Sequence, residues 1–203
     1  MTRDDLKYKI KTIIDDQTPI NSNINVGGFD KSPIDDYIEN LLDSSADDIQ
    51  LNAPLSKLTA TELTAEFNKL TENIGEVLCP SDYLRLISFK MSDWQKPAII
   101  AIKEESIIGD RQNNKYICGK TAKPVVVIKN SVSEQNFGNL VFEYHSSTKH
   151  TGKVLYCKKK RAEELNDFLT EPLCWLVAGN VLSIVGNENF KVTLENAAAL
   201  LNK

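Results

Sequence analysis

Residues 172–185 read PLCWLVAGNVLSIV, and apolar side chains fall on nearly every side of this segment when it is placed on a helix. A helix that is apolar all round is typical of the buried core of a protein. Pro172 favours the start of that helix, after a short helix expected over 162–169, and Gly186 with Asn187 favours its end. The pattern predicts a central buried helix, followed by a last helix from Phe190 to Leu201.

The segment before this helix has the pattern of β-strands. Short runs of β-branched, aromatic and other apolar residues alternate with turn-forming stretches such as residues 136–139, Asn-Phe-Gly-Asn. Such runs with short connections are typical of an antiparallel sheet. The expected strands are residues 76–79, 83–91, 98–102, 124–128, 140–144 and 154–157.

Two helices are expected at the start of the chain. Thr2 is the predicted N-cap of the first, which stops before Pro19, and Ser32 with Pro33 begins the second. Residues 20–31 are polar and turn-forming, whereas residues 45–72 fit either a loose helix or extended chain. The order of helices, strands and helices favours an α+β fold, a helical bundle with an inserted small antiparallel β-sheet domain. The expected parts are residues 1–72, 73–160 and 161–203.

The charge of the chain is unevenly distributed. The 203 residues have a net charge of −4, but residues 1–50 hold eleven acids and five bases, a net of −6, and the rest are net +2. The four cysteines are too widely spaced for a zinc-ribbon pattern and are expected to be reduced and mostly buried. The first residues do not have the pattern of a signal peptide, and the apolar run at 173–179 is too short to span a membrane.

Motifs for catalysis or cofactor binding are weak. Gly119-Lys120-Thr121 is similar to the end of a phosphate-binding loop, but Asn114 stands where that loop needs a glycine. His145 and His150 flank a predicted hairpin loop with no orienting carboxylate in a motif around them. The acidic doublets, such as Asp15-Asp16, point in different directions on a helix. We expect no catalytic, cofactor or metal site, although an enzyme with a noncontiguous site that uses the two histidines stays an alternative.

A basic segment stands out near the end of the strand region. Between Glu143 and Glu163 there is no acid, while six lysines and arginines occur. Such a segment could contact nucleic acid through phosphates, or an acidic surface of another subunit, or could protect an exposed sheet edge. Its basic residues are Lys149, Lys153, Lys158, Lys159, Lys160 and Arg161.

A resemblance to a known family rests on residues 78–97, LCPSDYLRLISFKMSDWQKP. This stretch resembles the pattern LP-x-D-F/Y-L-R-L-x-S-x-K-M-x-x-W-x-x-P of virion structural proteins from tailed phages of gut Bacteroidetes, the crAss-like type. Cys79 and the shortened approach Gly75-Glu76 depart from the pattern. The last forty residues, with Gly186 and an alanine-rich end, resemble head-tail adaptor or connector proteins. The likeness runs in order from residue 33 to the end.

The resemblance implies a structural protein without enzymatic activity. It implies a ring of identical subunits, a dodecamer, in the neck of the virion, formed in the host cytoplasm and joining the portal and other neck or tail proteins. Packaged DNA would pass through the ring without sequence-specific binding, and no membrane or cofactor is implied. The alternative is a nucleic-acid-binding accessory protein that uses residues 149–161.

The uneven charge suggests how such subunits could meet. A ring needs two different faces of a subunit to contact each other. We hypothesise that an acidic face of the first two helices contacts the basic segment of a neighbouring subunit or of the portal, so that reversing Lys158, Lys159 and Lys160 to glutamate weakens the ring, most at low salt. The predicted interface residues are Asp15, Asp16, Asp35, Asp36, Glu39, Asp43, Lys149, Lys153, Lys158, Lys159, Lys160 and Arg161.

Overall fold

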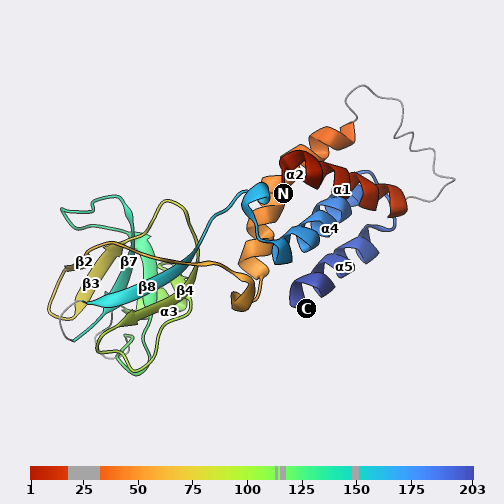
Figure 1. The fold of residues 1–203 in the computed structure, drawn as a ribbon. Helices are drawn as coiled ribbons and strands as arrows, with labels where there is room; N and C mark the ends of the chain where they lie inside the picture. The colour runs from red at the N-terminus through yellow and green to blue at the C-terminus, as the bar shows by residue number, and fades with distance from the viewer. Residues whose placement is uncertain (18–32, 113, 115–117, 148–150) are drawn as a thin grey trace. The chain divides into compact units, whose positions relative to one another are not determined.

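The computed structural model describes residues 1–17, 33–112, 114, 118–147 and 151–203. The chain forms two compact units, one made of residues 1–58 and 159–203 and the other of residues 59–158 (Figure 1). Helices make up the first unit and mainly strands the second, so the α+β class expected from the sequence is confirmed. The β unit is inserted between two helical segments of the chain.

Four helices pack around a common core in the first unit. Its helix α4 (Asp167–Ile184) contacts all three others, and its buried side chains belong to the same apolar cluster as those of its neighbours. Gly179 allows the close approach of one neighbour, because a Cβ atom there would lie 2.6 Å from the side chain of Leu194. The buried central helix predicted from its composition is thus confirmed. The other elements are α1 (Arg3–Gln17), α2 (Pro33–Asn52) and α5 (Phe190–Asn202), with 3₁₀ turns η1 (Leu55–Lys57) and η2 (Ala162–Glu164).

The ends of α4 show which local signals were correct. Gly186 adopts a positive φ of 75°, and the amides of Gly186 and Asn187 donate to the carbonyls of Ser183 and Leu182, a Schellman motif that ends the helix as predicted. The predicted start was wrong. The chain does not form a helix over 162–169 and restart at Pro172, because Asn166 caps the helix by accepting a 3.1 Å hydrogen bond from the Leu169 amide. Pro172 then lies inside α4.

The first helix begins as its sequence predicts. The Thr2 hydroxyl accepts from the Asp5 amide at 3.2 Å, and the Asp5 carboxylate accepts from the Thr2 amide at 3.0 Å, which is a capping box. The predicted cap of α2 at Ser32, the expected loop at 20–31 and His150 lie outside the described residues.

Among the described residues of the second unit, eight strands form two sheets. The three-stranded sheet has the order β1-β8-β4, and the five-stranded sheet has the order β2-β3-β7-β6-β5, with a short helix, α3 (Ile107–Gln112), after β5. All described pairs are antiparallel except β5 with β6, which is parallel, so the expected single antiparallel sheet is corrected. The strands are β1 (Ala60–Glu62), β2 (Phe67–Lys69), β3 (Ile74–Leu78), β4 (Tyr83–Met91), β5 (Ala101–Lys103), β6 (Val126–Asn130), β7 (Leu140–His145) and β8 (Gly152–Lys158).

Aromatic side chains join the two sheets across a shared core. Phe89 of β4 packs against Phe142 and Tyr144 of β7, with ring centroids 6.1 and 5.4 Å apart, and against Trp94 at 5.6 Å. Aromatic pairs at these distances add to the stability that burial of their surface provides. The core therefore connects the β4 turn to the five-stranded sheet.

Two further expectations are corrected by strand pairing. The strands before and after the segment that His145 and His150 flank do not form the expected hairpin, because β7 pairs with β3 and β6 while β8 pairs with β1 and β4. The units change at residues 58/59 and 158/159, whereas the sequence placed the changes at 72/73 and 160/161. The short strands β1 and β2 explain the first shift, because they pair with β8 and β3 of the second unit.

Candidate functional site

The predicted acidic face of α2 contacts bases of the same chain. Lys11 pairs with Asp35 at 2.5 Å, Lys7 pairs with Glu39, and Arg3 binds Glu39 at 2.7 Å. The bases of α1 and the acids of α2 each recur every four residues, which places each set along one side of its helix. Two oppositely charged stripes therefore join these antiparallel helices.

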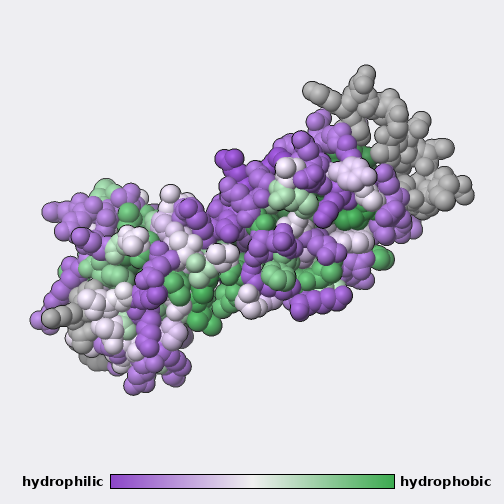
Figure 2. All heavy atoms as spheres, viewed as in Figure 1, coloured by the Kyte–Doolittle hydropathy of each residue, from purple (hydrophilic) through white to green (hydrophobic). Residues whose placement is uncertain are grey.

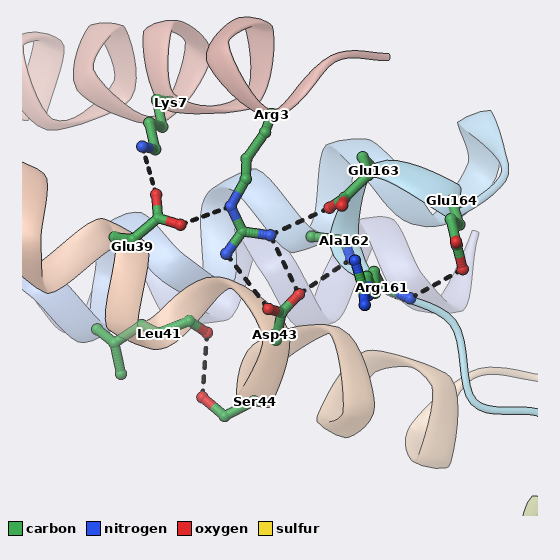
Figure 3. A network of polar contacts seen from close by, with 10 residues as sticks. All are labelled: Arg3, Lys7, Glu39, Leu41, Asp43, Ser44, Arg161, Ala162, Glu163 and Glu164. Atoms are coloured by element: carbon green, nitrogen blue, oxygen red, sulfur yellow. Dashed lines mark hydrogen bonds and ion pairs between the residues drawn. The ribbon is translucent and has the colours of Figure 1, made fainter. Parts of the chain in front are cut away.

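Arg3 lies at the centre of this ladder, as Figure 3 shows. Its guanidinium also binds Asp43 at 3.2 Å and Glu163 of η2 at 3.1 Å. Burial acts to raise the pKa of Asp43, but hydrogen bonds from Arg3 and the Ala162 amide hold that pKa below its ordinary value. Lys7 and then Arg3 likewise lower the pKa of Glu39. These five side chains, Arg3, Lys7, Glu39, Asp43 and Glu163, thus fix α1, α2 and η2 to one another.

The basic segment is also paired within the chain. Lys153 binds Glu62 at 2.8 Å, Lys158 binds Asp82 at 2.9 Å, and Lys159 pairs with Asp47. Each of these lysines is therefore at least partly neutralised by its own chain. This arrangement weakens both the nucleic-acid interpretation and the simple picture of an unpaired basic surface.

The remaining predicted interface residues have other settings. Asp15, Asp16 and Asp36 are exposed on α1 and α2, and Lys149 lies outside the described residues. The amide of Lys160 donates to the buried Gln50 side chain at 3.3 Å. The Arg161 amide donates to the Glu164 carboxylate at 3.3 Å, within the network drawn in Figure 3. Arg161 lies near Asp43, and its charge also lowers the pKa of that carboxyl.

A pocket in the second unit brings together two motifs that the sequence left apart. It has a volume of about 480 Å³, within the range of about 300–1,000 Å³ found for ligand pockets. The stretch Gly119-Lys120-Thr121 forms one wall, and His145 with the two following serines forms another. The complete lining is Thr71, Asn73, Ile74, Cys118, Gly119, Lys120, Thr121, His145, Ser146 and Ser147.

The turn after β4 organises both of these walls. Asp93 accepts hydrogen bonds from the Ser146 hydroxyl at 2.9 Å and from the Ser147 amide at 2.7 Å. The Trp94 indole donates to the His145 carbonyl at 2.7 Å, and the Gln95 amide donates to the Thr121 carbonyl at 2.9 Å. Three consecutive residues of the stretch that carries the family resemblance therefore shape this pocket.

Gln112 supports the wall from behind. It is buried, its amide nitrogen donates to the Val125 carbonyl at 3.2 Å, and its oxygen accepts from the Gly119 amide. A Cβ atom at Gly119 would lie 2.8 Å from the Val125 amide nitrogen, so only glycine fits here without movement. The glycine of the rejected phosphate-loop motif thus has a packing role.

The geometry does not form a serine nucleophile activated by His145. The hydroxyls of Ser146 and Ser147 both donate to Asp93, whose pKa they and the Ser147 amide hold below its ordinary value against the opposing effect of burial. The His145 Nε2 is buried and has no hydrogen-bond partner among the described residues. Burial lowers the pKa of this imidazole, so it is neutral near pH 7.

The cysteines and helices add no other site in the described part of the chain. All four cysteines are free, and burial raises the pKa of Cys79 to about 12 and that of Cys174 to about 11, as expected for inert thiols. Among the described residues, no three His, Cys, Asp or Glu side chains are grouped for a metal ion. None of the described helices has the length and hydropathy needed to cross a membrane.

Comparisons with known proteins do not place the chain in a family. No model of a known protein family matches the sequence, and no curated protein matches it significantly.

Proposed function

We propose that this protein is a structural subunit of a tailed-phage virion that assembles with copies of itself into a ring in the neck, between the portal and the tail. The resemblance of residues 78–97 to virion structural proteins of tailed phages supports the phage part of this proposal, and the likeness of the C-terminal residues to head-tail adaptors supports the place in the neck. The turn from Asp93 to Gln95 belongs to that stretch and forms hydrogen bonds with both walls of the pocket. The stretch therefore has a structural role. DNA would pass through the ring without sequence-specific contacts.

The observation that carries self-assembly is an exposed apolar surface beside the edge strand β5. Ile99 and Ile100 precede this strand and are 57% and 67% exposed, and Ile107 and Ile108 on α3 are 73% and 48% exposed. Exposed apolar residues that gather on a surface often mark a site of protein–protein contact. Figure 2 shows apolar surface on the second unit as well as on the helices. Contact with another subunit would remove these isoleucines from water.

The same edge also offers hydrogen-bonding groups and a groove. β5 is the last strand of the five-stranded sheet, and an edge strand has unpaired backbone groups along one side. A groove of about 350 Å³ lies beside it, and its lining combines apolar residues such as Pro97, Ile100 and Val125 with Lys96 and Lys123. An apolar surface with a charged border is typical of a protein interface.

Negative-stain microscopy and sedimentation of the purified chain test the proposal. We expect annular particles that become more abundant with protein concentration. Concentrations up to about 100 μM would reveal a contact with a Kd of roughly 10 μM. A chain that sediments as a 22.7 kDa monomer throughout this range would refute self-assembly.

A pair of variants tests the surface that carries the proposal. Ile100→Asn with Ile107→Asn should weaken assembly without lowering the thermal stability, because both side chains are already exposed. Tyr8→Asn removes an aromatic ring that is 74% exposed on α1 and serves as the matched control. Equal effects of the isoleucine and tyrosine changes would show that the β5 surface has no special part in assembly.

A further inference from the structure

The loop between β6 and β7 is held by a buried carboxylate. Glu76 is fully buried on β3, and it accepts hydrogen bonds from the Ser131 hydroxyl at 2.7 Å, the Asn136 amide at 2.8 Å and the Ser133 hydroxyl. Burial acts to raise the pKa of Glu76, but these three donors outweigh it and hold the pKa below its ordinary value. Gly138, with a φ of 76°, completes the turn. The loop of residues 131–139 is therefore fixed from inside the fold.

This fixed loop carries apolar side chains on its outer side. Val132 is 77% exposed and Phe137 is 78% exposed, and Glu134 between them is also exposed. A loop that is already ordered loses little conformational entropy when it binds. Exposed aromatic side chains on rigid backbone are favourable contact residues, because they bury a large area with few rotatable bonds. The loop thus has the properties of a docking element.

The pocket lies at the other end of the strands that carry this loop. Near the loop, Asn130 pairs with Leu140 and Leu78 pairs with Val141, whereas Ile74 pairs with His145 in the pocket wall. Figure 1 shows β3 and β7 side by side. A strand of this length spans about 17–20 Å, so the loop of one chain is separated from its own pocket. A contact between the two must therefore join different copies.

The two ends are complementary in charge and polarity. The pocket has the apolar side chains of Ile74 and Cys118 and the exposed cation Lys120. The loop has an apolar ring at Phe137 and a carboxylate at Glu134. A carboxylate brought to the pocket would find a cation, the exposed ammonium group of Lys120.

We propose that the loop of residues 131–139 of one copy enters the pocket of the next copy, with Phe137 against Ile74 and Cys118 and with Glu134 beside Lys120. This inference rests on the proposed self-assembly and adds a second subunit contact to the one proposed at the β5 surface. Because the loop and the pocket lie at opposite ends of one sheet, the contact is head-to-tail. Repetition of a head-to-tail contact generates a closed ring when the rotation between subunits closes.

Cross-linking tests the contact directly. In Phe137→Cys, the new thiol should lie near Cys118 of the next copy, so mild oxidation or a short bismaleimide should give a ladder of covalent oligomers on a denaturing gel. The other three cysteines are buried. Cys118→Ser in the same chain should abolish the ladder. Tyr8→Cys, at an equally exposed position on α1, should give none through Cys118.

A charge exchange tests the pairing without relying on cysteine chemistry. Lys120→Glu and Glu134→Lys alone should each lower the association constant about fivefold, and together they should return it to within about twofold of wild type. Both positions are exposed, so the fold should tolerate the changes. The sedimentation of wild type, both single variants and the double variant gives these constants.

The outcomes separate this contact from self-assembly itself. A monomeric wild-type chain would refute the proposed function. A wild-type ring with no ladder from Phe137→Cys and no rescue by the charge exchange would overturn only the loop-to-pocket contact. A link that forms within one chain, with no increase in mass, would also overturn it.

Discussion

Glu76→Ala gives the sharpest test of how the docking loop is built. The substitution removes the acceptor of three hydrogen bonds from Ser131, Ser133 and Asn136, and it leaves a cavity at a fully buried position on β3. A buried donor left without an acceptor costs about 1–3 kcal/mol. Ser133 and Asn136 are only partly buried, so water can accept some of the hydrogen bonds that they no longer donate to Glu76. We expect the free energy of unfolding of the second unit to fall by about 3 kcal/mol.

Urea denaturation followed by tryptophan fluorescence measures this change. Trp94 is in the second unit and Trp175 in the first, so a Trp175→Phe background reports the second unit alone. Glu76→Gln keeps one oxygen acceptor and a similar volume, and it should cost only about half as much. A loss below about 1 kcal/mol for Glu76→Ala, or equal losses for both variants, would refute the account of the buried carboxylate.

The pH dependence of the unfolding free energy, compared between wild type and Glu76→Gln, gives a second test of the buried carboxylate. The folded-state pKa of Glu76 lies below its unfolded value of 4.5. The ionised carboxylate therefore contributes stability that is fully present above pH 4.5 and is lost as the pH falls through the lower, folded-state pKa. The difference in unfolding free energy between wild type and Glu76→Gln should shrink on acidification through this range. A difference that stays constant or grows would contradict the expected direction.

Three other substitutions test the packing and charge pairs of each unit. Arg3→Ala should lower the unfolding free energy by about 1–2 kcal/mol, because it leaves three acids close together at a half-exposed site. The loss should be smaller in 1 M salt, which screens the repulsion between these acids. Urea titration followed by Trp175 fluorescence measures both values. Gly179→Val should cost about 1–3 kcal/mol by the same assay, because the new side chain overlaps Leu194. Lys158→Glu should raise the pKa of Asp82, which its hydrogen bond to Lys158 now lowers, and carboxyl NMR titration reports that shift. The lowered pKa of Asp82 gives stability above its unfolded pKa that acid removes, and this contribution should be smaller in the variant.

The sequence was sufficient to predict the elements that residues close to one another in the chain determine. Thr2 with Asp5, and Gly186 with Asn187, gave correct helix ends because each cap is made by residues within a few positions of one another. The strand at 83–91 was predicted with its observed bounds, because its apolar and β-prone residues run without interruption between turns. The central helix followed from its apolar composition alone.

Pairing over long distances was not predictable in the same way. The strands β1 and β2 have only three residues each, and their pairing with β8 and β3 gives them their structure. A run this short carries no periodicity. The pocket unites segments around residues 71–74, 118–121 and 145–147, and only the turn at Asp93 to Gln95 connects their positions. The burial of Glu76 likewise depends on donors 55 to 60 residues away.

The charge pattern of the first helices could have been interpreted more fully from the sequence. Arg3, Lys7 and Lys11 recur at intervals of four residues, as do the acids at 35, 39 and 43. Two such stripes of opposite sign on consecutive helices predict an antiparallel pair joined by ion pairs. The hypothesis of contact with another subunit counted the acids and left out these bases.

The internal pairing changes where a subunit contact should be sought. Reversing Lys158, Lys159 and Lys160 would break the ion pairs of the first two with Asp82 and Asp47, so a weakened ring would not separate lost contacts from lost stability. Exposed side chains that make no such internal pair are better probes. The loop carboxylate and the pocket lysine can exchange charge without disturbing the ladder of α1 and α2. If the ring depends on the basic segment instead, reversal of those lysines should weaken assembly even in a variant whose unfolding free energy is restored by a stabilising change elsewhere. If it depends on the loop and the pocket, restoring the stability should restore the ring.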